Sequence, residues 1–316
     1  MSYAQFGTIQ ASDFNTLVGG NPTTTINTLN ATWATGGGSA GYGQTADANV
    51  AVGDTVTSTN WANLVTKTAN SALHQGTSIT SVTAPVSGGT VTYLSAIPTN
   101  LTTIYTSRLN AASQGSTIAN TITTAATWSD KATWTHTATF ANGDAARYFF
   151  NSGGQLKITM SHPSGTGINL LLNNLAANVG TVSQSAPSSG TITISSVSYN
   201  GITRVGGGGN SPTIATNAGY YAMTTANANA YYQTASTGPS GYLSTNINIF
   251  IKSNGTQGSN SDTGSVITIY TVWDEIPNGL VVASGSAVAV TAQAPETTYL
   301  GNTWGTITLA GSVAVV

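Results

Sequence analysis

Asn246-Ile247-Asn248-Ile249-Phe250-Ile251 is the stretch that decides the fold of this chain. Isoleucine recurs at every second position, and successive side chains of a β-strand point to opposite faces of a sheet, so the stretch predicts a strand with one buried face. Similar runs predict strands over 191–197, 242–252 and 265–273, with two or three more between 279 and 316. Many short strands separated by Gly- and Asn-rich turns are typical of a β-sandwich.

The region from 133 to 160 predicts a three-stranded meander. Two turn signals divide it, Asn142-Gly143 and Asn151-Ser152-Gly153-Gly154, and Asn-Gly is the dipeptide most typical of a two-residue hairpin turn. A short helix is expected over 167–179, where leucines are dense. The predicted strands of the meander are Trp134–Phe140, Arg147–Phe150 and Gln155–Met160.

The first part of the chain instead carries apolar residues at helical spacing. Helices are expected from Ser12, from Ser58 or Thr59 and from Thr99 or Asn100, and Asn21-Pro22 is typical of a further helix start. The predicted class is therefore α+β: a short-helical N-terminal region, residues 1–112, followed by a mainly antiparallel β-sandwich, residues 113–316.

Two of the helical stretches resemble each other at an offset of 47 residues (56 − 9 = 47). Each combines an apolar residue, a hydroxyl, an aromatic residue and a leucine, which predicts superposable strand–turn–helix units over 8–20 and 55–75. Their aromatic and leucine side chains are expected to form the core of a docking region. These four residues are Phe14, Leu17, Trp61 and Leu64.

The charge content excludes several classes of protein. Seven Lys or Arg and nine Asp or Glu give a net charge of 7 − 9 = −2, and charged residues make up 5% of the chain. A nucleic-acid partner is not expected, because seven scattered cations cannot form the basic surface that such binding needs. No run of about 20 apolar residues predicts a membrane span. The chain has no cysteine, which excludes disulfides and thiolate metal sites.

Several short motifs resemble catalytic signatures but have simpler interpretations. The run Gly36–Gly41 fits both GxGxxG and GxSxG around Ser39, yet a helix precedes it and a coil follows, so a plain loop is expected. Asp262-Thr263-Gly264-Ser265 matches the aspartic-protease tetrad and is expected to be a turn. Asp274-Glu275 cannot form a facing acid/base pair in an extended segment. No catalytic residue, metal or cofactor is predicted, and the protein is expected not to be an enzyme.

Histidines and tyrosines leave alternatives open. The three histidines, His74, His136 and His162, lie far apart in the sequence, and His136 is expected on a sheet surface; a symmetric trimer could still gather three copies of one of them around a metal. Two tyrosine pairs in a segment of very low charge could contact a glycan or a protein partner, or could belong to the core. These pairs are Tyr220-Tyr221 and Tyr231-Tyr232.

Short motifs along about two-thirds of the chain resemble virion structural proteins of tailed bacteriophages, particularly of the cyanophage type. The resemblance implies a fibre, a neck or baseplate appendage or a capsid decoration protein, made in the host cytoplasm and located in the virion. It supplies no catalytic residue, and it does not include 180–239. The motifs that carry it are Tyr42-Gly43-Gln44, Val52–Leu64 with Trp61, His74-Gln75-Gly76, Ala145–Gly154, Tyr242-x-x-Thr245-Asn246 and Trp273-Asp274.

The expected function is therefore that of a non-enzymatic structural component of a phage particle, in contact with other virion proteins. One alternative is a tail protein that binds a receptor or a host surface glycan through the tyrosine pairs. A glycan-degrading tailspike is a weaker alternative, because it needs two carboxylates held about 5–10 Å apart. Low charge and an uncharged C-terminal strand predict a homo-oligomer, with a trimer favoured, in which the C-terminal strands or N-terminal helices are covered by a neighbour.

Overall fold

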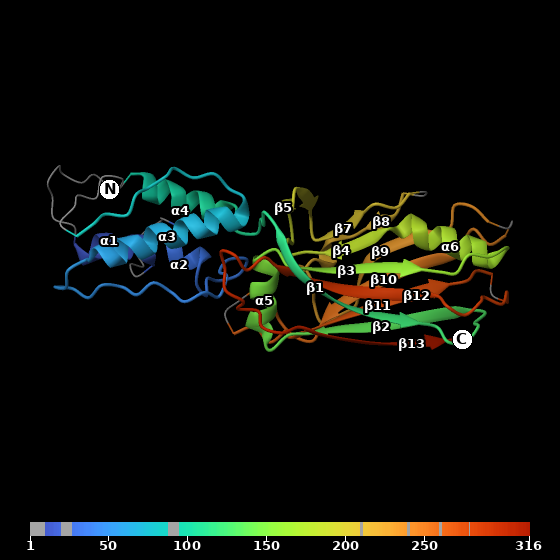
Figure 1. Cartoon of the computed structure of the whole chain (residues 1–316). Helices are drawn as coiled ribbons and strands as arrows, with labels where there is room; N and C mark the ends of the chain where they lie inside the picture. The colour runs from blue at the N-terminus through green and yellow to red at the C-terminus, as the bar shows by residue number, and fades with distance from the viewer. Residues whose placement is uncertain are drawn as a thin grey trace.

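The computed structural model describes residues 10–19, 27–87, 95–208, 211–238, 241–258, 261–277 and 279–316. The N-terminal helices lie at one end of the molecule and the strands form the other end (Figure 1). The expected fold class is confirmed: the chain is α+β, with short helices mainly in its N-terminal part and antiparallel sheets after them.

Four helices build the described part of the N-terminal region. Their apolar faces share one cluster that contains Phe14, Leu17, Trp61 and Leu64, each at most 3% exposed. The rings of Phe14 and Trp61 meet edge to face at 5.5 Å, so the equivalent aromatic residues of the two similar stretches contact each other. The helix start expected at Asn21-Pro22 lies outside the described residues. The helices are α1 (Ala11–Val18), α2 (Leu29–Thr32), α3 (Ser58–Gln75) and α4 (Ala96–Thr106).

The starts of α1 and α3 keep the same offset as their core residues. Gln10 caps α1 and Thr57 caps α3, again 47 residues apart (57 − 10 = 47). The Asp13 carboxylate accepts the N–H of Gln10 at 2.9 Å, and the Asn60 Oδ1 accepts the N–H of Thr57 at 2.9 Å. The expected helix starts, Ser12 and Ser58 or Thr59, lie one or two residues after these caps. In both helices the side chain that reaches back belongs to the third helical residue. No described strand precedes either helix, and superposition of the two units stays a prediction.

The strands form two main antiparallel sheets and a small hairpin. The five-stranded sheet has the order β1-β12-β3-β4-β7, and the six-stranded sheet has the order β13-β2-β11-β10-β9-β8. Residues 191–197, expected as one strand, contribute instead to the hairpin β5-β6. The strands are β1 (Gln114–Thr123), β2 (Lys131–Thr139), β3 (Gln155–Ser161), β4 (Thr181–Gln184), β5 (Ile192–Ile194), β6 (Val197–Tyr199), β7 (Ile202–Val205), β8 (Thr213–Ile214), β9 (Ala228–Thr234), β10 (Asn246–Ser253), β11 (Val266–Asp274), β12 (Ala287–Pro295) and β13 (Thr308–Val315).

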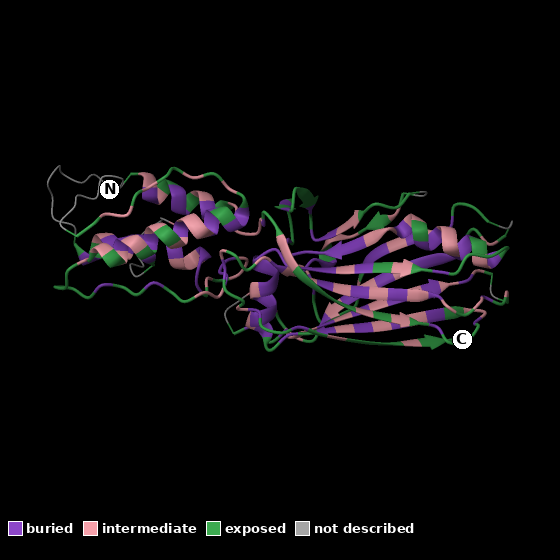
Figure 2. Cartoon of the chain, in the orientation of Figure 1, coloured by how far each residue is buried: buried purple, intermediate pink, exposed green. Residues whose placement is uncertain are grey.

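Period-two alternation places the sandwich core between the two sheets. Ile247, Ile249 and Ile251 are fully buried, and buried positions alternate with intermediate ones along the central strands (Figure 2). Trp134 of β2 and Trp273 of β11 meet at 5.3 Å within this core. His136 is 1% exposed on the same inward face of β2, so its expected position on the sheet surface is wrong.

The predicted strand Arg147–Phe150 is wrong, because this segment belongs to helix α5 (Gly143–Asn151). The Asn142 side chain accepts the N–H of Ala145 at 2.8 Å and caps the helix. Gly143 has no positive φ; a Cβ at this position would lie 2.1 Å from the main-chain oxygen of Asp262. Asn-Gly therefore marks a helix cap and a close main-chain approach here, and not a hairpin.

The predicted meander is wrong for the same reason. Helix α5 carries the chain from one sheet to the other, so β2 and β3 lie in different sheets. It lies at the end of the sandwich nearest the N-terminal helices (Figure 1). The helix expected over 167–179 is confirmed as α6 (Ile168–Val179), which packs against β3, β9 and β10. A short 3-10 helix, Thr216–Ala218, precedes β9.

Candidate functional site

A buried polar joint connects the helical region to the sandwich, and we call it the Arg147 joint. Its centre is Arg147 of α5, whose side chain is 0% exposed. The Arg147 Nη1 donates to the carbonyl oxygens of Thr35 and Ala40, each at 2.9 Å. Asn151, one turn further along α5, donates from Nδ2 to Ala40 O at 3.1 Å and to Gly41 O at 2.9 Å. Through these hydrogen bonds α5 holds the glycine-rich loop that follows α2.

The loop can turn this tightly because of its glycines. Gly41 has a φ of 89°, and a Cβ there would lie 2.2 Å from the Thr35 oxygen. The carbonyls on either side are thereby turned toward α5 and away from water. Ser39, the serine of the GxSxG match, accepts a hydrogen bond from Arg108 Nη2 at 2.7 Å. Residues 36–41 form a loop, as expected, but its role in the joint was not predicted.

Two aspartates balance the charge of Arg147. The Arg147 Nε lies 3.3 Å from Asp144 Oδ1 and 3.7 Å from Asp262 Oδ2. Asp262 Oδ2 also accepts the N–H of Gly258 at 3.0 Å, and Asp144 Oδ2 accepts the N–H of Ser261 at 3.1 Å. The loop that contains the protease-like tetrad is therefore anchored on α5. Its aspartate is an ion-pair partner, which agrees with a structural interpretation of the motif.

The tyrosine pairs do not form an exposed platform, which corrects their interpretation as a contact surface. Tyr220 and Tyr231 are 0% exposed, and Tyr220 stacks on Phe150 with ring centroids 4.4 Å apart. The hydroxyl of Tyr221 belongs to the joint, 2.6 Å from Asn151 Oδ1 and 2.9 Å from Gly38 O. Tyr232 is half-buried on β9. Burial raises the pKa of Tyr220 and Tyr221, and it raises the pKa of Tyr231 to about 12.

The C-terminal end of α3 adds further buried polar contacts to the joint. The His74 Nε2 lies 3.1 Å from Ser152 O, which makes it the protonated nitrogen of a neutral ring. Burial lowers the pKa of His74 to about 4. Gln75 Nε2 donates to the hydroxyl of Tyr42 at 2.7 Å, and this hydroxyl donates to Arg108 O at 2.8 Å.

Several of the short motifs singled out in the sequence meet at this joint. Tyr42-Gly43-Gln44, His74-Gln75-Gly76 and the Ala145–Gly154 segment all contribute side chains to it. A later segment also reaches it, because Gln44 exchanges two hydrogen bonds with Gly301, at 2.8 and 3.0 Å. Leu300 beside it is buried in the helical cluster.

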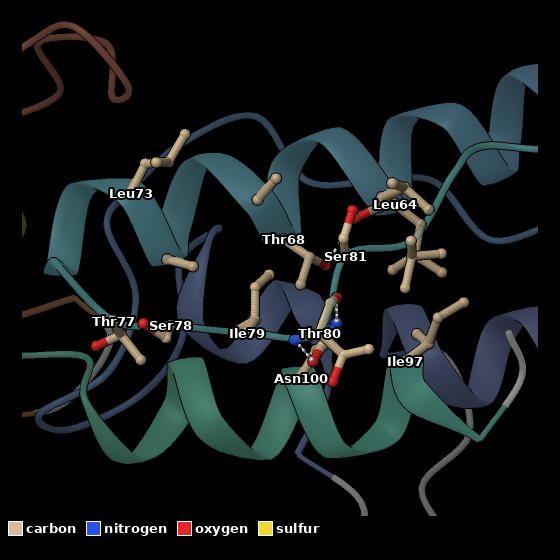
Figure 3. Close-up of a pocket in the computed structure, with 14 residues that line it drawn as sticks. Leu64, Thr68, Leu73, Thr77, Ser78, Ile79, Thr80, Ser81, Ile97 and Asn100 are labelled. Atoms are coloured by element: carbon tan, nitrogen blue, oxygen red, sulfur yellow. Dashed lines mark hydrogen bonds between the residues drawn. The ribbon is translucent and has the colours of Figure 1, made fainter.

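An uncharged groove opens on the helical region between α3, the segment 77–82 and α4 (Figure 3). Its volume is about 420 Å³. Leu73, at 51% exposure, stands at its rim. No lining residue is charged; the lining is Leu64, Val65, Thr68, Ala69, Ala72, Leu73, Thr77, Ser78, Ile79, Thr80, Ser81, Val82, Ile97 and Asn100. Of the four residues expected as a docking core, Leu64 reaches this groove, and the other three pack inside the cluster.

Asparagines inside helices hold the extended segments of this region, a role that sequence reasoning missed. Asn100 of α4 accepts the N–H of Thr80 at 3.0 Å and donates to the Thr80 oxygen at 2.8 Å. Asn15 of α1 and Asn30 of α2 pair in the same way with Val50 and Asp47. A side-chain amide can replace a neighbouring strand in this way. Asparagine is disfavoured in a helix interior, so its presence there was the available signal.

The histidines stand in three separate surroundings. His162 lies 2.8 Å from Ser286 Oγ and 3.0 Å from Asn169 Oδ1, whereas neither ring nitrogen of His136 has a hydrogen-bond partner among the described residues. Burial lowers the pKa of both rings, to about 4 for His136. In the part of the chain that the structure describes, no three His, Asp or Glu side chains gather where they could hold a metal ion. None of the described helices is long and apolar enough to cross a membrane.

No protein-family model, curated protein or solved structure matches this chain.

Proposed function

We propose that this protein is a non-enzymatic structural component of a tailed phage particle, assembled from several copies, whose helical end docks on another virion protein. The observation that carries the docking role is the uncharged groove beside α3. It lies on the helical region, and its apolar wall is accessible at Leu73. A groove of this kind accepts a neutral, apolar segment without the cost of removing water from a charge.

The main chain beside the groove favours an extended peptide as the occupant. Both main-chain groups of Thr80 pair with Asn100. In an extended segment, the residues before and after Thr80 direct their N–H and C=O groups to the side opposite to that of Thr80, away from Asn100. Ile79 and Ser81 make no main-chain hydrogen bond to another described residue. An uncharged segment of the partner can therefore add as a strand along 77–82 and place an apolar side chain in the groove.

The Arg147 joint supports a structural role for the chain as a whole. It fixes the helical end to the sandwich through hydrogen bonds from Arg147 and Asn151 to carbonyl oxygens of the loop at 35–41. The ion pairs of Arg147 with Asp144 and Asp262 hold the side chain of Arg147 in position for these contacts. Asp144 and Asp262 are both paired with Arg147, which disfavours them as the free acid and base of a tailspike hydrolase. Tyr220 and Tyr231 are buried, so the tyrosine pairs no longer favour a glycan-binding surface.

Mass spectrometry of purified particles from the phage that encodes the chain tests the location. We expect the chain at a fixed copy number per particle. Its absence from particles that contain their other structural proteins would rule out the proposed function.

The docking groove is tested by Leu73→Asp, with Leu170→Asp as the matched control. Leu73 and Leu170 are exposed leucines on helices, at 51% and 46%, and Leu170 lies on α6 of the sandwich. We expect Leu73→Asp to reduce incorporation into particles at least tenfold, because its carboxylate would lose hydration in the occupied groove. Leu170→Asp should incorporate like the wild type. Equal incorporation of both variants would assign docking to another surface.

A further inference from the structure

The two sides of the sandwich end in very different edge strands. On one side the sheets end at β7 and β8, which have four and two residues, and β7 carries Arg204. On the other side they end at β1 and β13, with ten and eight residues. Proteins protect exposed sheet edges from other chains by short strands and by charges. One side of this sandwich has that protection and the other does not.

The long edges lie next to each other and form one surface, which we call the β1–β13 side. β1 and β13 contact each other across the two sheets. β1 pairs with β12 and β13 pairs with β2, so each strand has one main-chain edge without a partner strand among the described residues. Most residues of both strands are exposed, including Ile118 at 44% and Val315 at 37%.

The chemistry of this side points to a partner that is equally uncharged. Neither β1 nor β13 contains a charged residue. A partner that brought a charged edge would lose hydration of its charges and gain no ion pair. A second copy brings edges with free main-chain groups and no charge, and the net charge of −2 adds little repulsion between copies.

We propose that the β1–β13 side is covered by a second copy of this chain, through strand pairing between the long edges. The inference deepens the homo-oligomer of the proposed function and rests on it, and it now includes β1, which the sequence did not indicate. Pairing extends the sheets into the neighbour and satisfies the free main-chain groups.

Native mass spectrometry of the full chain, with and without lysines on β13, tests the proposal. Ala310→Lys/Ala314→Lys places two charges at exposed positions of the long edge. Thr213→Lys/Ile214→Lys is the matched control, because it places two charges on the short edge β8, at positions that are also exposed. We expect an oligomer for the wild type and the control. For the β13 variant we expect the mass of a monomer, and a dissociation constant of the oligomer at least tenfold higher than that of the wild type.

Hydrogen exchange of the β13 amides separates a lost interface from a lost fold. In the β13 variant, protection should fall along β1 and β13 and persist in β10 and β11. A monomeric wild type, or an oligomer that both variants retain, would overturn the proposal. If the β13 variant dissociates as expected while the chain is absent from phage particles, the result would support this interface and rule out the virion role.

Discussion

Buried polar side chains of this protein differ in whether they have partners. Arg147 is surrounded by two carboxylates and two carbonyl oxygens, and His74 donates to Ser152 O. His136, equally buried, has no partner for either ring nitrogen among the described residues. Paired groups in the joint hold two parts of the chain together, and removal of one member leaves the others desolvated.

Arg147→Met should lower the free energy of unfolding by about 3–5 kcal/mol, since it removes the ion-pair partner of the buried Asp262 carboxylate and a donor to the Thr35 and Ala40 oxygens. Urea denaturation followed by fluorescence measures the loss. Lys131→Met, at an exposed position of β2, is the control and should change stability by less than about 0.5 kcal/mol. Equal stability of the two variants would contradict the assigned role of the joint.

The pH dependence of stability should reflect His74. Its pKa is lowered from 6.5 to about 4 in the folded chain, so the unfolded chain binds more protons between these pH values. Stability that is present above pH 6.5 should therefore decrease as the pH falls toward 4, by up to about 3 kcal/mol from this one group.

His74→Gln isolates this contribution, because an amide can still donate to Ser152 O and does not titrate in this range. The difference in unfolding free energy between wild type and variant should change from pH 7 to pH 4.5 in favour of the variant. Burial also lowers the pKa of His136 and His162, so the variant should retain part of the acid sensitivity. If the difference in unfolding free energy does not change with pH, His74 is not a source of the acid sensitivity.

Helix α5 illustrates how an element can carry signals for two structures. Asn142-Gly143 and the glycines at 153 and 154 suggest hairpin turns. Ala145, Ala146, Phe149 and Phe150 nevertheless recur at helical spacing, and all four are buried at the end of the sandwich. Burial of one helical face outweighs the local preference of the dipeptide, since the same side chains on a strand would alternate between core and solvent.

Substitutions at the start of α5 should separate the cap from the close approach. Asn142→Ala should cost about 1 kcal/mol through loss of the cap, and Asn142→Ser should restore most of it. Gly143→Ala should cost more than Asn142→Ala, because the added methyl would meet the Asp262 oxygen at 2.1 Å. Thermal unfolding of the three variants gives the order. A larger effect of Asn142→Ala than of Gly143→Ala would contradict this account.

At the scale of the whole molecule, the described residues form two main apolar clusters, which polar contacts connect. One lies within the helical region and the other between the sheets. The joint contributes hydrogen bonds between them. Each cluster can therefore lose packing while the other keeps it, although the joint couples their positions.

Trp61→Ala should lower the free energy of unfolding of the helical region by about 3–5 kcal/mol. Hydrogen exchange should accelerate in α1, α3 and α4 and stay slow in β10 and β11, because Trp61 belongs to the helical cluster alone. Trp134→Ala, in the sandwich cluster, is the reciprocal control and should show the opposite distribution. Uniform acceleration across the chain in either variant would mean that the two clusters unfold as one unit.

Local periodicity was enough to predict much of the fold. Alternating isoleucines at 247, 249 and 251 indicated β10, and the spacing of Trp61, Leu64 and Thr68 indicated α3. The joint could not be predicted, because Arg147 meets the carbonyl of Thr35 over 112 residues of sequence and Tyr221 meets that of Gly38 over 183. The groove likewise depends on the position of 77–82 between two helices.

The sequence by itself determined most of the helices and strands, because their periodicity arises from neighbours within a few residues of each other. It also determined the low charge, which makes uncharged surfaces inevitable. The tertiary structure alone decided which surfaces those are. It buried Tyr220 and Tyr231, turned Asn142-Gly143 into a helix cap, and left β1 and β13 as open edges. Burial, close approach and strand order depend on contacts between distant segments, and local residue preferences do not specify them.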